Sequence, residues 1–298
     1  MSGDELRALA ERVSNRGRWG DDDERGTLNH ITESVRLAAL VEVRSGRTHS
    51  IAQDIDFVAS ARNPRPATLE IQTDDDIDRT VRDEFTIAAH GFATTHADAV
   101  GHCYFDDELY NGRARSAAVS DRGLEFGAIT AQADGVVTRG VLLDVAAVRG
   151  TERLSPGDHV TPADLDAAER LAGTTVRAGD AIFVHVGSGR GADPAFLPDG
   201  TMTRVGLSAE CLVWLHDHRV AVYSGDCVDV FPSPFPEYPD FFHQIALGRM
   251  GLAMLDCPNV GRLVELCRHE ARSTFLLTYA PLRIPRGTGS PVNPLVMF

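Results

Sequence analysis

Residues 161–189 read TPADLDAAERLAGTTVRAGDAIFVHVGSG and contain a complete helix–turn–strand unit. Thr161 is a typical N-cap residue, Pro162 suits the first helical position, and Asp164 places an acid in the first turn. The helix should therefore cover residues 162–172 and end at Gly173. The apolar run from Ala181 to Val186 then predicts a buried strand, which Gly187 ends.

The same alternation of short apolar strands and helices continues along the chain, which is typical of an α/β fold. No change in composition marks a boundary, so we predict a single domain over residues 1–298. The remaining segments are assigned from periodicity and from turn residues. Strands are predicted near 50–57 and at 141–145, 220–224, 252–255 and 274–279, helices at 4–13, after Thr32 and at 208–216, 243–250 and 259–271, a solvated acidic loop at 73–83, and a rigid Pro-rich loop at 231–239.

Composition narrows the function. The formal net charge of −14 argues against a nucleic-acid partner and against an anionic membrane surface. The five cysteines are scattered and form no C-x-x-C pair, which favours a reducing compartment and gives no thiolate zinc knuckle. Neither a signal peptide nor a run long enough to cross a bilayer is evident, so we expect a cytoplasmic protein without a membrane partner.

Three histidines and an aspartate fall within thirteen residues: His90, His96, Asp98 and His102. Imidazole and carboxylate ligands suit Zn²⁺ or Mn²⁺. In an extended segment His96 and Asp98 point to the same side, so both can reach one ion. A single buried histidine is usually a hydrogen-bonded core residue, and the spacing alone leaves that reading as open as the metal site.

The segment 90–102, HGFATTHADAVGH, resembles the signature of the cyclase family, approximately H-x-G-T-H-x-D-A-[PL]-x-H. This family includes bacterial kynurenine formamidases, isatin hydrolase and a trans-dienelactone hydrolase, all metal-dependent. The triplet Tyr110-Asn111-Gly112 is similar to a motif of the family's longer members. Further resemblance lies in WGDDDERGTLN at 19–29, TRGVLLD at 138–144, His243-Gln244 and GTGSPVNP at 287–294.

The resemblance implies a mixed β-sheet or barrel-like core flanked by helices, the swivelling β/β/α arrangement of cyclase-like proteins. It also implies that His96 and Asp98 bind metal, that His102 is the catalytic base or proton shuttle, and that His243 and Asp256 complete the site. Phe92 stands where short members carry a ligand histidine, so His90 is a conditional substitute. One or two Mn²⁺ or Zn²⁺ ions per chain are expected.

Other residues are assigned to the surroundings of the site. Asp226 has two possible roles. It either hydrogen-bonds to a metal ligand or to His102 and orients it, or it caps a turn. Phe92, Tyr104 and Phe105 are expected to line the substrate pocket. The expected partner is a small-molecule substrate, and relatives lead us to expect a homodimer or homotetramer.

The function implied is hydrolysis of a C–N or C–O bond in a small amide, cyclic amide or imide, or lactone by metal-activated water. A lyase or cyclase of the same fold and a non-catalytic binding protein are the alternatives. A serine hydrolase is disfavoured, because Val186 replaces the first glycine of a G-x-S-x-G elbow around Ser188.

Overall fold

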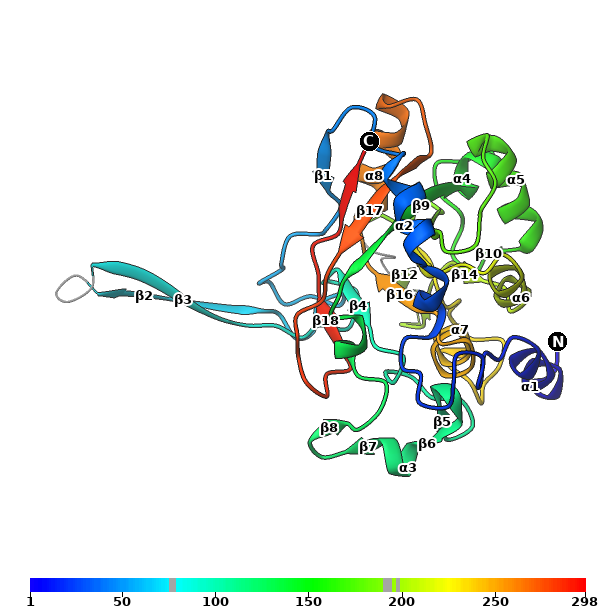
Figure 1. The fold of residues 1–298 in the computed structure, drawn as a ribbon, viewed down its shortest axis with the longest axis horizontal. Coiled ribbons are helices and arrows are strands. Elements are labelled where there is room, and N and C mark those ends of the chain that lie inside the picture. Colours follow the sequence, from blue (N-terminus) through cyan, green and yellow to red (C-terminus); the bar gives the residue numbers. More distant parts are fainter. Residues whose placement is uncertain (75–78, 190–194, 197–198) are drawn as a thin grey trace.

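The computed structural model describes residues 1–74, 79–189, 195–196 and 199–298 (Figure 1). Within these residues the main element is a curled, mixed sheet of nine strands flanked by helices. The predicted α/β class with a mixed sheet is thereby confirmed. In spatial order its strands are β1 (Thr48–Ser50), β19 (Leu295–Met297), β17 (Thr274–Tyr279), β9 (Val136–Asp144), β11 (Ala181–His185), β15 (Val222–Gly225), β16 (Ala253–Asp256), β4 (His96–Asp98) and β18 (Gly289–Pro291).

The helices and minor strand pairs surround this sheet. The helices are α1 (Gly3–Arg12), α2 (Glu33–Leu40), α3 (Arg115–Ala118), α4 (Val145–Val148), α5 (Pro162–Ala172), α6 (Glu210–Asp217), α7 (Phe241–Ile245) and α8 (Val260–His269), with short 3₁₀ turns at Gly26–His30, Tyr110–Gly112 and Ile129–Gln132 and a π-helical turn at Ala246–Met250. The minor pairs are β2 (Thr68–Asp74) with β3 (Thr80–Thr86), β5 (Glu108–Leu109) with β6 (Arg113–Ala114), β7 (Val119–Ser120) with β8 (Gly123–Leu124), β10 (His159–Val160) with β14 (Gly206–Leu207), and β12 (Ala195–Phe196) with β13 (Met202–Thr203).

The four central strands β9, β11, β15 and β16 run parallel and are buried on both faces. This burial explains their continuous apolar sequences. In β11, Ile182 and Val184 face one core cluster with helices α5, α6 and α7, whereas Ala181 and Phe183 face the second cluster with α8. The carboxyl ends of the parallel strands share one edge of the sheet, where ligands bind in open α/β folds.

The local capping signals correctly predict α5. Its Thr161 side chain accepts from the Asp164 amide, the Asp164 carboxylate accepts from Thr161, and Gly173 takes a left-handed conformation at φ 62°. The two side chains accept hydrogen bonds from backbone N–H groups at the start of the helix, and the Gly173 N–H donates to carbonyl groups at its end. The predicted strand 274–279 also coincides with β17.

Two segment predictions are wrong. The strand expected near residues 50–57 covers only Thr48–Ser50, since a three-residue edge pairing with β19 is all that forms there. The acidic loop expected at 73–83 is largely the end of a hairpin, in which β2 and β3 project from the body (Figure 1); residues 75–78 lie outside the described residues. Alternating apolar residues formed the hairpin despite its acidic content, and its Leu69, Ile71, Val81 and Phe85 side chains are exposed.

No helix in the described ranges has both the length and the apolar character needed to cross a bilayer.

A close backbone approach at Gly206 leads to a stability prediction. A Cβ atom there would lie 2.1 Å from the Val230 nitrogen and 2.4 Å from the Asp229 carbonyl carbon. Backbone atoms cannot rotate away, so Gly206→Ala is expected to lower the free energy of unfolding by about 3 kcal/mol. Urea unfolding measures the change. Gly261→Ala in α8 is the control, because its new methyl would meet only the Asn259 side chain at 3.9 Å; equal stability of the two variants would contradict the prediction.

Candidate metal centre

Strand β4 places two of the predicted ligands between two neighbouring strands. His96 lies opposite Asp256 of β16, and Asp98 lies opposite Gly289 of β18. A Cβ atom on Gly289 would be 2.6 Å from the His90 ring, so the glycine makes room for this imidazole. The strand pairings therefore bring residues from both ends of the chain to one place.

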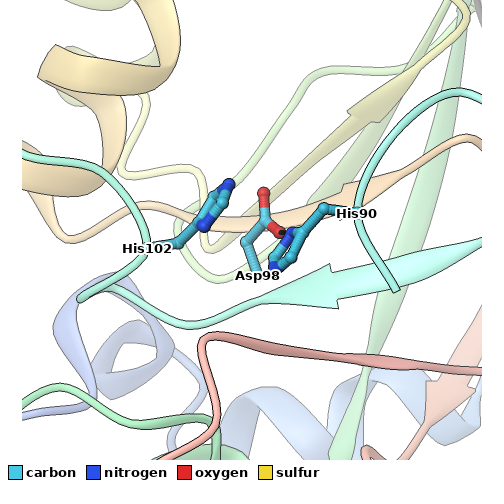
Figure 2. A group of neighbouring side chains, drawn as sticks. All are labelled: His90, Asp98 and His102. Atoms are coloured by element: carbon cyan, nitrogen blue, oxygen red, sulfur yellow. Dashed lines mark ion pairs between the residues drawn. The ribbon is translucent and has the colours of Figure 1, made fainter. Parts of the chain in front are cut away.

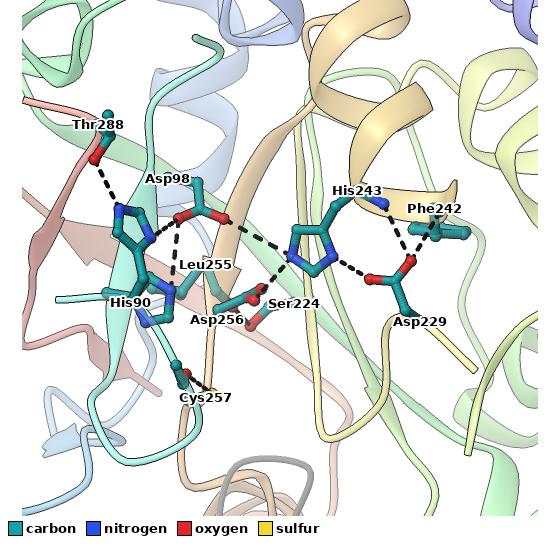
Figure 3. Close-up of polar contacts among 12 residues, drawn as sticks. His90, Asp98, Ser224, Asp229, Phe242, His243, Leu255, Asp256, Cys257 and Thr288 are labelled. Carbon is teal, nitrogen blue, oxygen red and sulfur yellow. Dashed lines mark hydrogen bonds and ion pairs between the residues drawn. The ribbon is translucent and has the colours of Figure 1, made fainter. Parts of the chain in front are cut away.

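Asp98 is the centre of the group, with 1% of its surface exposed. Its Oδ1 atom lies 3.0 Å from His90 Nδ1 and 3.5 Å from His96 Nε2, and its Oδ2 atom lies 3.8 Å from His243 Nε2 (Figure 3). Asp256 joins the group through a 3.1 Å contact between its Oδ2 atom and His243 Nε2. Two carboxylates and three imidazoles thus converge.

Two of the imidazoles are oriented by hydrogen bonds on the far side of the ring. The Nδ1 atom of His96 donates to the Thr94 carbonyl at 2.8 Å. The Nδ1 atom of His243 donates to Asp229, which also accepts from the Phe242 amide at 2.8 Å (Figure 3). A proton held on Nδ1 leaves the Nε2 lone pair of each ring free to bind a metal.

Several buried polar atoms of this group have no hydrogen-bond partner. They are both carboxylate oxygens of Asp98, Oδ1 of Asp256 and Nδ1 of His90; Asp98 Oδ1 and His90 Nδ1 face each other at 3.0 Å without forming a hydrogen bond of good geometry. Leaving such atoms unpaired in the interior is unfavourable. A divalent cation would satisfy them, and the ligand atoms of His96, Asp98 and Asp256 lie within 4.8 Å of one another. The residues therefore fit a site for a divalent metal ion.

His90 and His102 form a second pair of imidazoles at Asp98. Their rings stack with centroids 3.8 Å apart and an interplanar angle of 4°, next to the carboxylate (Figure 2). His90, Asp98 and His102 also offer ligand atoms within 4.8 Å of one another. Nε2 of His90 contacts Thr288 Oγ1 at 3.0 Å, which fixes the ring against β18. The geometry thus supports His90 as a ligand and permits two roles for His102.

Burial and charge oppose each other at the ionisable groups. Burial lowers the pKa of His243, but Asp229 and Asp256 outweigh it and hold that pKa well above its usual value. Burial raises the pKa of Asp98, but His102, His90 and His96 hold it below its usual value. Burial dominates at His102, whose pKa is lowered to about 4 despite the nearby Asp98 carboxylate. His102 is therefore neutral at pH 7 and able to accept a proton.

The other predicted residues lie farther from the centre. Asp226 accepts from the amides of Val186 and Ser188, at 2.7 and 2.8 Å, which is the turn-capping role. Phe105 is 1% exposed, and its ring stacks on that of Tyr238 in the core.

Phe92 and Tyr104 each carry an arginine over the ring. The guanidinium of Arg204 lies 4.6 Å from the Phe92 centroid, and that of Arg115 lies 4.8 Å from the Tyr104 centroid. Tyr104 is substantially exposed and Phe92 is partly buried. Both rings are therefore accessible enough to contact a small molecule.

Sequence reasoning missed Asp229 and Thr288, which hold His243 and His90. Asp229 follows a strand and precedes the Pro-rich loop, where an acid is usually a solvated turn residue. Thr288 is within the C-terminal segment of the family resemblance, which was the available signal for a residue near the site.

Asp229→Asn is expected to weaken metal binding by about 10- to 100-fold. The amide oxygen of Asn can still accept from Phe242, but an amide NH₂ facing His243 would make Nδ1 an acceptor and move the ring proton to Nε2. Nε2 is the atom that faces Asp256, and a protonated Nε2 has no lone pair with which to bind the metal. Competition with a fluorescent chelator measures the affinity.

Asp240→Asn is the matched control, because Asp240 precedes α7 in the same loop and makes no side-chain cap bond to that helix. An unchanged metal affinity in Asp229→Asn, or an equal loss in Asp240→Asn, would contradict the tautomer argument.

Comparison with known proteins agrees with this architecture. Residues 39–230 match the sequence model of the Cyclase family, which is well over half of the chain. A solved structure described as a novel cyclase is 25% identical, with a TM-score of 0.82 over 96% of this chain and 100% of its own. No curated protein sequence matches.

Two isatin hydrolases share the fold at lower identity. Isatin hydrolase A from Labrenzia aggregata, bound to benzyl benzoate, is 18% identical, with a TM-score of 0.60 over 91% of this chain and 98% of its own. Isatin hydrolase A from Ralstonia solanacearum is 18% identical, with a TM-score of 0.55 over 84% of this chain and 91% of its own. These two show a likeness of fold alone. On the strength of the family match, the chain belongs to the cyclase family.

Proposed function

We propose that this protein is a metal-dependent hydrolase that cleaves a C–N or C–O bond of a small amide, cyclic amide or imide, or lactone. The observation that carries the proposal is the pair of buried carboxylates, Asp98 and Asp256, with three oxygens lacking hydrogen-bond partners and imidazole Nε2 atoms around them. The isatin hydrolases of the same fold support the choice of reaction class.

Each residue of the group has a separate task in this proposal. His96, Asp98, His243 and Asp256 hold a Mn²⁺ or Zn²⁺ ion, and His90 is a further ligand on the side of Thr288. A bound ion supplies Lewis acidity, which polarises a carbonyl and brings the pKa of water toward about 7. His102, neutral because burial lowers its pKa to about 4, accepts a proton from the attacking water and returns it to the leaving nitrogen or oxygen.

The test combines metal analysis with a small substrate panel. Purified protein is loaded with Mn²⁺ or Zn²⁺, and aryl formamides, cyclic imides and lactones are supplied in oxygen-18-labelled water. The expected result is stoichiometric metal, turnover that a chelator abolishes, and one labelled oxygen in the carboxylate product. Turnover that forms a dehydrated or cyclised product without label would instead identify a lyase or cyclase. Absence of both metal binding and turnover would identify a binding protein.

A further inference from the structure

Arg204 is a buried cation beside the predicted pocket. It follows β13 directly, and its backbone pairs with Phe231 through hydrogen bonds of 3.2 and 3.3 Å. Only 7% of the residue is exposed. The guanidinium carbon lies 4.6 Å from the Phe92 centroid and 5.6 Å from the Phe231 centroid, so two aromatic rings flank the charge.

The described residues provide Arg204 with no carboxylate partner. The two other arginines buried to this degree in the described ranges are paired, Arg139 with Asp180 and Arg249 with Glu108. Arg204 has no such ion pair in the described ranges, and its Nε, like that of Arg249, is buried without a hydrogen-bond partner. Cation–π contacts offset only part of the cost of burying a charge. The guanidinium charge of Arg204 is therefore available to pair with an anion.

Arg204 contacts two segments that also build the candidate metal centre. Phe92, which the guanidinium covers, stands four residues before His96 in the loop that leads into β4. The segment after Arg204 lies against the backbone of Asp229, which holds His243. The charge of Arg204 also acts on Asp240. Burial raises the pKa of the Asp240 carboxyl and Asp229 raises it further, whereas the positive charges of His243 and Arg204 lower it.

Because carboxylates surround the candidate metal centre, a nearby cation such as Arg204 affects which substrates can approach. Asp98, Asp229, Asp240 and Asp256 are gathered here, and the chain as a whole carries a formal charge of −14. An anionic substrate would be repelled unless the metal and a local cation offset these charges. Arg204 supplies that cation in an apolar setting, where its electrostatic attraction is strong.

We propose that Arg204 binds a carboxylate of the substrate, so that the substrates of this enzyme are amides or lactones that also carry a carboxylate group. A guanidinium presents two parallel N–H groups to a carboxylate and is suited to bidentate recognition. The Phe92 ring beside it provides a face for a planar or aromatic part of the same molecule. This inference rests on the proposed hydrolase function and makes its substrate class specific.

The test uses metal-loaded protein and matched substrates: an aryl formamide bearing a carboxylate, and its carboxamide analogue. The wild type is expected to favour the carboxylate in kcat/KM. In Arg204→Met the kcat/KM for the carboxylate substrate should fall by about 10²-fold, mainly through KM, because a charge-assisted pair is lost. The carboxamide should lose at least about tenfold less, and Arg204→Lys should recover part of the preference.

Arg122→Met is the control, since it removes the same charge from a side chain that is 73% exposed. Equal losses on both substrates in Arg204→Met would overturn the inference and identify Arg204 as a structural support of the Phe92 loop. A wild type without preference for the carboxylate would overturn it as well.

A binding measurement separates failure of this inference from failure of the proposed function. If the wild type hydrolyses neither these two substrates nor any member of the panel of formamides, imides and lactones, the hydrolase proposal fails, and calorimetry with benzoate and benzamide still tests Arg204. Benzoate should bind the metal-loaded wild type at least about tenfold more tightly than it binds Arg204→Met, with no such difference for benzamide. Equal benzoate affinity in the two proteins would overturn the carboxylate site.

Discussion

Asp98→Asn is expected to abolish stoichiometric metal binding and to lower kcat/KM by at least about 10³-fold. Asp98 is the carboxylate that contacts His90, His96 and His243 together, so no other residue of the group can replace it. A metal ion contributes several kcal/mol of transition-state stabilisation, and about 4 kcal/mol corresponds to about 10³-fold in rate. Metal analysis and steady-state kinetics on the same preparation measure both effects.

Stability separates loss of the site from loss of the fold. Asn has the shape of Asp, so its amide oxygen can take the position of Oδ1 facing His90 Nδ1, and its NH₂ can donate toward the Nε2 lone pair of His243, which faces Oδ2. The metal-free variant should therefore unfold within about 1 kcal/mol of the metal-free wild type. Added metal at 1,000 times its Kd should stabilise the wild type by about 4 kcal/mol and the variant by much less.

Asp226→Asn is the matched control for Asp98→Asn, because Asp226 is equally buried but accepts from the amides of Val186 and Ser188 in the loop after β11. It should retain metal and the metal-dependent rise in Tm. If Asp98→Asn kept a full complement of metal, or Asp226→Asn lost it as completely, Asp98 would not be the central ligand.

Local signals in the sequence are sufficient where a structural element depends on neighbouring residues. Helix α5 begins and ends where its capping residues predict, and β17 coincides with a six-residue apolar run. The β2–β3 hairpin shows the limit of this reasoning. Acidic residues suggested a solvated loop, whereas Leu69 pairs with Phe85 and Thr73 with Val81 across two strands. Cross-strand pairing is a property of two segments, so composition within one of them did not reveal it.

The sequence predicts the part of the candidate site that lies within one motif, His96 and Asp98. His96 and Asp98 are close in sequence, and strand periodicity puts them on one side. Asp256 reaches His96 because β16 pairs with β4, although the two residues are far apart in the chain, and His243 of α7 joins them through its contact with Asp256. The resemblance to the cyclase family supplied that pairing; periodicity did not.

The residues that sequence reasoning missed act through contacts that no motif encodes. Asp229 reaches His243 only when the loop after β15 folds back on α7. Arg204 is unusual because it is buried without a carboxylate, and burial is a property of the folded chain. Likewise, the stacking of the Phe105 ring on Tyr238 in the core follows from packing, which proximity to the motif does not reveal.

His102→Ala is expected to lower kcat by about 10²- to 10⁴-fold while leaving metal content unchanged, as for loss of a positioned general base. The structure makes this a discriminating experiment, because His102 lies both where it could transfer a proton and within ligand distance of His90 and Asp98. His102→Gln is the companion variant, since it retains a polar side chain of similar reach without a proton-accepting imidazole.

The pH dependence distinguishes the two roles of His102. Burial lowers its pKa to about 4, so it is neutral, and competent as a base, throughout the range above about pH 5. The rate deficit of His102→Ala should therefore be of similar size from about pH 6 to about pH 8 at saturating metal. If His102 is instead a ligand, its removal weakens metal affinity, and raising the metal concentration should restore much of the rate. Such a restoration would transfer His102 from the proton-transfer role to the ligand set.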